Sequence, residues 1–163
     1  MSFQFRYFDG ESVMAERIIE KYARRVGYTP SELETFHEGG HRTRQVKQLS
    51  KAALLYSIEA EVVSTRHCNS GHLEGQKIIL DVDGNFVTGL CPKKMCVYLV
   101  SQLTVPVALI NERLSEGHDP DHFHFMRYVR CLDVGVECLG YGEVMLKVRV
   151  VPRVKPPSPD TDT

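Results

Sequence analysis

The periodicity of the sequence changes at Tyr56, and this change constrains the fold more than any other feature. Before it, apolar residues recur at helical spacing, as in the stretch RTRQVKQLSKAALLYS. After it, Tyr56, Ile58, Ala60 and Val62 alternate with polar residues, which is typical of a half-buried strand. We therefore expect an α+β fold, with helices in the N-terminal third and a sheet after them.

The N-terminal third predicts a series of helices. The stretch SVMAERIIEKYARRVGY is amphipathic, and a second helix begins with the capping box of Thr29 and Glu32, which has Pro30 at its first position. A third helix follows the glycines at 39 and 40. The side chains expected to point inward are Val13, Ile18, Tyr22 and Val26 in the first helix, and Val46, Leu49, Ala53 and Leu54 in the third.

The rest of the chain predicts a small antiparallel sheet with one long helix. Two apolar runs flank Asp83-Gly84, which is a hairpin signal, and EVMLKVRVV alternates like a strand. The long helix is expected from Pro92 to Gly117, with a kink or break at Pro106. The chain is thus divided into a helical extension (1–55), an α+β domain (56–152) and a disordered tail (153–163).

The charge balance excludes several classes of function. With 20 basic and 21 acidic side chains the net charge is -1, so we expect neither nucleic acid nor a membrane surface as a partner. No apolar run approaches the ~20 residues that span a bilayer, and the N-terminus does not resemble a signal peptide. A cytoplasmic location follows as an expectation. The five cysteines are then reduced thiols or metal ligands.

Three of these cysteines predict a shared site. Cys68, Cys91 and Cys131 each lie at an end of a predicted element, and such ends can converge in a compact sheet. His72, four residues after Cys68, is a fourth candidate ligand. Three cysteines and a histidine can close a tetrahedral zinc site, whereas three cysteines alone leave an open position on zinc or on an iron–sulfur cluster.

Cys91 also suggests a different chemistry. It precedes Pro92 and is expected near the N-cap of the long helix, where the helix dipole favours a thiolate. A thiol enzyme with Cys91 as the nucleophile and His72 or His122 as the base is therefore an alternative. A third interpretation is a non-catalytic accessory subunit that docks a protein partner, or a second copy, through its N-terminal helices, because familiar enzyme motifs are missing.

Other cysteines and histidines have plainer interpretations. Cys96 and Cys138 are expected to pack as small apolar residues. His118, His122 and His124 crowd the segment GHDPDHFH, which is either a ligand cluster or an ordinary Asp-Pro-Asp turn. His37 and His41 are separated by two glycines, which argues against a shared helical face.

The stretches CNSGHLEGQKIIL, GLCPKKMCVYL and RCLDVGVECLGYGEVMLKVRVV together resemble a family of short, uncharacterised bacterial proteins. Members share a cysteine before a glycine-containing turn, a Cys-Pro at a helix start and a cysteine before the final strand. The resemblance covers about residues 58–151. It implies that Cys68, Cys91 and Cys131 belong to one site, and it implies no particular reaction.

Overall fold

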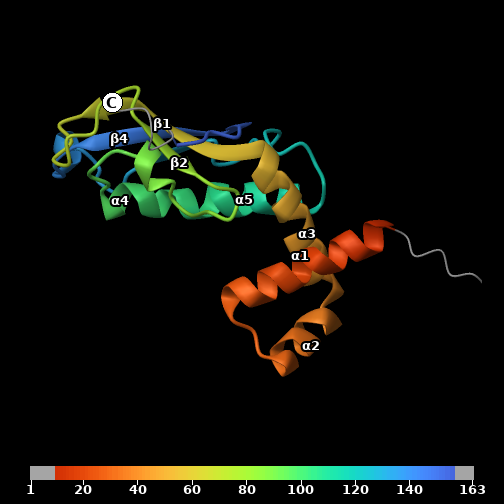
Figure 1. The fold of residues 1–163 in the computed structure, drawn as a ribbon. Helices are drawn as coiled ribbons and strands as arrows, with labels where there is room; N and C mark the ends of the chain where they lie inside the picture. The colour runs from red at the N-terminus through yellow and green to blue at the C-terminus, as the bar shows by residue number, and fades with distance from the viewer. Residues whose placement is uncertain (1–9, 157–163) are drawn as a thin grey trace, which may run out of the picture.

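The computed structural model describes residues 10–156. In that part of the chain, three helices precede the sheet, as expected: α1 (Gly10–Val26), α2 (Pro30–Glu38) and α3 (Gly40–Leu55). They form a group at one end of the sheet, and α3 runs directly into the first strand (Figure 1). The α+β class predicted from the change of periodicity is confirmed.

The capping box at the start of α2 is confirmed atom by atom. The Glu32 amide donates to Thr29 Oγ1 at 3.3 Å, and the Thr29 amide donates to Glu32 Oε2 at 2.8 Å. The Thr29 amide, and after it the Thr29 hydroxyl, which donates to the same oxygen at 2.8 Å, lower the pKa of Glu32. The rings of Tyr22, Tyr28 and Phe36 then pack together, with centroids 5.6 to 6.0 Å apart. Helices α1 and α2 are thus joined by an aromatic cluster.

The buried faces of the helices differ in part from the prediction. In α1, Ile19 and Ala23 are buried and Val26 is exposed; the side chain of Val13 lies outside the described residues. In α3, Ala52 is buried whereas Leu54 is 71% exposed. Because α3 passes straight into a strand, the orientation of its last turn follows the strand rather than an amphipathic stripe.

The sheet has four antiparallel strands in the order β2-β1-β4-β3. Their bounds are β1 (Tyr56–Arg66), β2 (Lys77–Leu80), β3 (Tyr128–Arg130) and β4 (Glu143–Pro152). Ala60 is opposite both Ile78 and Val148, in the middle of the sheet. A β-bulge interrupts the pairing of β1 with β4 between Val62 and Ser64, and such a bulge bends the strand locally.

The predicted hairpin at Asp83-Gly84 forms only partly. The chain turns there, with Gly84 at φ +87°, but it returns beside β2 through a single bridge between Leu80 and Phe86. It then enters the short 3₁₀ helix η1 (Thr88–Leu90). The expected second strand is therefore reduced to one bridge.

The prediction of one long helix from Pro92 is wrong. The structure has α4 (Val97–Val100), the 3₁₀ helix η2 (Ser101–Leu103) and α5 (Thr104–Ser115), and residues 92–96 are not helical. Pro106 lies in the first turn of α5, where a missing N–H breaks no helical hydrogen bond. This proline therefore belongs to the start of a helix and produces no kink within one.

The core lies between one face of the sheet and the helices α4 and α5, which run along it (Figure 1). Its fully buried side chains include Ile58, Val62, Ile110, Leu146 and Val148. Of the predicted tail, residues 153–156 have no regular secondary structure and residues 157–163 lie outside the described part. Within residues 10–156, no helix combines the length and the apolar character needed to cross a bilayer.

Candidate functional site

A cavity of about 710 Å³ lies at one end of the sheet. The chain segments around it are the loop after β1, the beginning of α4, the loop after β3 and the first residues of β4. This end of the sheet lies away from helices α1 to α3 (Figure 1). The side chains that line the cavity include Cys68, His72, Cys96, Tyr98, Cys131 and Tyr141.

Strand pairing explains why Cys68 and Cys131 meet here. Arg66 at the end of β1 pairs with Glu143, and Arg130 at the end of β3 pairs with Met145. The two cysteines follow these strands, so they flank the first residues of β4 from its two sides. Three of the four predicted site residues, Cys68, Cys131 and His72, therefore line one cavity.

Cys91, the fourth predicted residue, does not line this cavity. Its Sγ–H donates to the carbonyl oxygen of Ile79 at 3.3 Å. Its backbone is extended, with φ -105° and ψ 158°, because a residue before proline is disfavoured in the α region. The nearest α-helix begins only at Val97. The expected position at a helix N-cap is thus wrong, and the structural reason for a nucleophilic Cys91 is removed.

Cys96 has the helix N-cap position that was predicted for Cys91. It is the N-cap residue of α4, is half-buried and lines the cavity. Sequence reasoning missed it because a continuous helix from Pro92 placed Cys96 among core positions. The pair Cys91-Pro92 gave no signal of the later start, because a residue before proline and a helix N-cap are both extended.

His72 is the most deeply buried polar residue of the cavity, at 3% exposure. Its Nδ1 lies 3.4 Å from Gln76 Oε1, which also accepts a hydrogen bond from the Leu73 amide at 3.2 Å. Within the described residues, His72 Nε2 has no hydrogen-bond partner. A buried polar nitrogen without a partner is costly, and it calls for a bound ion or water as an explanation.

The sulfur of Cys131 receives a backbone hydrogen bond. The Val144 amide donates to Cys131 Sγ at 3.2 Å, and the Cys131 amide donates to the Val144 carbonyl at 2.9 Å. The Cys131 thiol in turn donates to the Asp133 carbonyl at 3.8 Å. Strand β4 and the loop after Cys131 therefore fix the position of this thiol.

The loop after Cys131 is held together by Asp133. Its carboxylate accepts the amides of Gly135 at 3.2 Å, Tyr141 at 2.9 Å and Gly142 at 3.2 Å. These bonds, with the Tyr141 amide the strongest, lower the pKa of Asp133. A Cβ at Gly142 would lie 2.2 Å from the His67 carbonyl oxygen, so only glycine lets this loop approach the loop that carries Cys68.

The donor atoms around the cavity suit a metal in their chemistry, but they do not form a closed set of ligands. Thiols and a neutral imidazole are the usual ligands of zinc. Across residues 10–156, no three side chains of histidine, cysteine, aspartate or glutamate converge closely enough to hold a metal ion as they stand.

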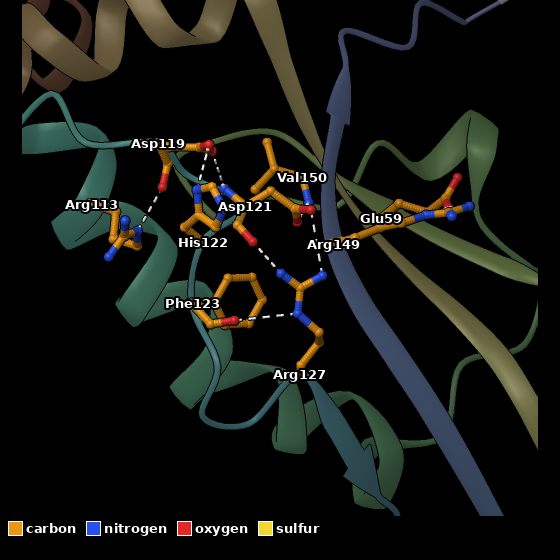
Figure 2. Close-up of polar contacts among 9 residues, drawn as sticks. All are labelled: Glu59, Arg113, Asp119, Asp121, His122, Phe123, Arg127, Arg149 and Val150. Carbon is orange, nitrogen blue, oxygen red and sulfur yellow. Dashed lines mark hydrogen bonds and ion pairs between the residues drawn. The ribbon is translucent and has the colours of Figure 1, made fainter.

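The histidine-rich segment 117–124 is a structural turn (Figure 2). His122 Nδ1 lies 2.6 Å from Asp119 Oδ2 at an exposed position, and Arg113 donates to the Asp119 carbonyl at 2.6 Å. The Asp121 amide donates to Asp119 Oδ1 at 3.0 Å. These contacts, led by the Asp121 amide, lower the pKa of Asp119. The carboxylate of Asp119 therefore organises a turn.

Asp121 connects this turn to the sheet. Its Oδ1 accepts the Val150 amide of β4 at 3.0 Å, and its Oδ2 lies 3.4 Å from Arg127 Nη1. Arg127 also donates to the carbonyl oxygens of Asp121 and Phe123 (Figure 2). His118, His122 and His124 are all exposed, and none of them lines the cavity.

The chain has no significant match among protein-family models, curated proteins or solved structures. The resemblance to three-cysteine bacterial proteins thus stays a prediction. The residues that line the cavity are the features of this chain that point to a function.

Proposed function

We propose that the protein is a small metal-binding module in which Cys68, Cys96, Cys131 and His72 hold one zinc ion. The observation that carries the proposal is that His72, whose buried Nε2 has no partner among the described residues, lines one cavity together with three cysteines. The set keeps three of the four residues predicted from sequence and replaces Cys91 with Cys96, because the Cys91 thiol is bonded to Ile79 outside the cavity.

Binding requires the thiols of Cys68 and Cys96 to move. The three cysteines are half-buried, and a change of χ1 between staggered wells reorients a thiol without moving the backbone. His72 and Cys131 are the residues fixed in advance, through Gln76 and Val144. A bound zinc ion would crosslink three separate loops and stabilise the folded state. Free thiols suit a reducing compartment, so we also propose a cytoplasmic location.

Metal content of protein purified without oxygen tests this function. We expect one zinc per chain in the wild type, and less than a tenth of that in Cys68→Ser and Cys131→Ser. Cys91→Ser is the matched control and should retain the full zinc content, because its thiol does not face the cavity. Iron with sulfide in place of zinc would identify the site as a cluster site. A folded wild type without metal, or loss of zinc in Cys91→Ser with retention in Cys96→Ser, would contradict the assignment.

A second proposal concerns a partner, and it rests on the loop pinned by Asp133. This loop exposes Val134, Val136, Leu139 and Tyr141, with Leu139 at 98%. Apolar side chains gathered on one ordered loop are typical of an interface, and a loop that is already ordered loses little entropy on binding. We propose a second copy of the chain as the occupant, because these exposed side chains carry no charge and the same loop from each copy can meet across a two-fold axis without repulsion.

Light scattering over a concentration series tests the dimer. Leu139→Glu should shift the chain from dimer to monomer, whereas Leu54→Glu, on the 71% exposed Leu54 of α3, should leave the dimer intact. The opposite pattern would place the interface on the N-terminal helices. A wild type that stays monomeric throughout would remove the proposal.

A further inference from the structure

We propose that Gln76 is a positioning residue that keeps His72 protonated on Nδ1 and so leaves Nε2 as a bare acceptor. The inference concerns the protonation state of one ring. It rests on the proposed metal site only for what Nε2 then binds.

The orientation of the Gln76 amide follows from a second donor. The Leu73 amide donates to Gln76 Oε1 at 3.2 Å, so the oxygen of this side chain, and not its NH₂ group, lies at that position. The same oxygen is 3.4 Å from His72 Nδ1. An amide oxygen has two lone pairs and accepts both bonds. Nδ1 must then carry the hydrogen, since two acceptors facing each other would repel.

The backbone of Gln76 continues the pairing of β2 with β1, next to the pair of Lys77 with Glu61. The Val62 amide donates to the Gln76 carbonyl at 2.8 Å, and the Gly75 amide donates to the Val62 carbonyl at 2.8 Å. Gly75 has φ +82°, which favours glycine. The backbone of Gln76 is therefore held beside a central strand, and the Leu73 amide holds its side-chain oxygen near His72.

This arrangement decides what His72 can bind. A neutral imidazole has one donor and one acceptor nitrogen. Because Nδ1–H donates to Gln76, Nε2 is the acceptor nitrogen. No described residue donates a hydrogen bond to it. Histidines that bind metals almost always donate their other N–H in this way, and loss of that partner costs 10–100-fold in metal affinity.

Nitrogen NMR of the His72 ring tests the inference in metal-free protein at about pH 8, above the ordinary histidine pKa of about 6.5. We expect the wild type and Gln76→Glu, which both offer an oxygen acceptor, to carry the proton on Nδ1. Gln76→Leu should move a substantial fraction of the proton to Nε2. Gln102→Leu makes the same chemical change on η2, outside the cavity, and should leave the ring unchanged.

Zinc titration of the same proteins supplies the second readout. Gln76→Leu should bind zinc about 10–100-fold more weakly than the wild type, while Gln76→Glu and Gln102→Leu stay within a few-fold. A proton on Nε2 in the wild type would overturn the inference, even if Gln76→Leu did not fold. So would an unchanged ring in a folded Gln76→Leu. A wild type with the expected Nδ1 proton that binds no zinc would sink the proposed metal site and leave the role of Gln76 standing.

Discussion

Arg149 and Glu59 face each other across strands β4 and β1, and Arg149 Nη2 lies 2.5 Å from Glu59 Oε1 (Figure 2). Glu59 is only 5% exposed, and Lys77 Nζ lies 3.1 Å from its other oxygen. The hydrogen bond to Glu59 raises the pKa of Arg149. A carboxylate is thus buried on the sheet face opposite α5, with two cations to compensate it.

The first prediction concerns this pair. Arg149→Ala should lower the free energy of unfolding by about 2 kcal/mol, because it leaves a buried carboxylate with one cation. The loss should stay below the ~3–5 kcal/mol of a fully buried pair, since the Arg149 side chain is 36% exposed. Urea unfolding measures it. Arg44→Ala breaks an exposed pair with Glu116 and should cost less than about 1 kcal/mol; equal losses in both variants would contradict the prediction.

The second prediction concerns pH and the loop at Asp133. The pKa of Asp133 is lowered from 3.8 by backbone hydrogen bonds, so its stabilising effect is complete above pH 3.8 and is lost as pH falls through its lower folded pKa. The amide NMR signals of Tyr141 and Gly142 should titrate below pH 3.8, and Asp133→Asn should abolish this titration. The Gly27 amide donates to the Ala23 carbonyl and is the internal control. Unchanged Tyr141 and Gly142 signals down to the acid unfolding of the whole chain would refute the role of Asp133.

The third prediction concerns the turn that Asp121 joins to the sheet. Asp121→Ala should destabilise the protein by about 2 kcal/mol, because the Val150 amide and Arg127 both lose an acceptor. His122→Ala, at an exposed position of the same turn, should leave the unfolding midpoint unchanged. Neither change should affect zinc content, and loss of zinc in His122→Ala would restore the histidine segment as a ligand cluster.

The fourth prediction concerns the relative reactivity of the thiols. Cys138 is exposed and the other four cysteines are half-buried, so Cys138 should react first with iodoacetamide. Cys91 should react slowly, because its thiol donates to Ile79. Mass spectrometry of partly alkylated protein gives the order. A Cys91 that reacts first at neutral pH would revive the thiol-enzyme hypothesis.

The sequence predicted those elements whose determinants are local. The alternation around Ile58 identified β1, and Thr29 with Glu32 identified the start of α2, because the residues that specify these features are neighbours in the chain. The long helix was predicted wrongly because a residue followed by proline is typical of a helix start, whereas residues 92–96 are not helical and α4 begins at Val97. Cys96, and not Cys91, is therefore the N-cap residue beside the cavity.

The parts of the candidate site that escaped prediction depend on long-range contacts. Gln76 gains its role only when its backbone pairs with Val62 of β1, and no residue pattern near Gln76 indicates the register of that pairing. Cys68 and Cys131 line the same cavity because both follow strands that pair with β4. Metal binding by these thiols stays a prediction.

The passage from α3 into β1 occurs between Leu55 and Tyr56, with no connecting loop. Arg153 strengthens this junction, because its amide donates to the Leu55 carbonyl at 2.8 Å and its Nη1 donates to the Ala53 carbonyl at 2.6 Å. Strand β1 then runs to Arg66, two residues before Cys68. Because no loop separates α3 from β1, a rotation of α3 also rotates the start of β1, whose other end lies beside the cavity. One continuous segment of the chain therefore connects the N-terminal helices with the cavity.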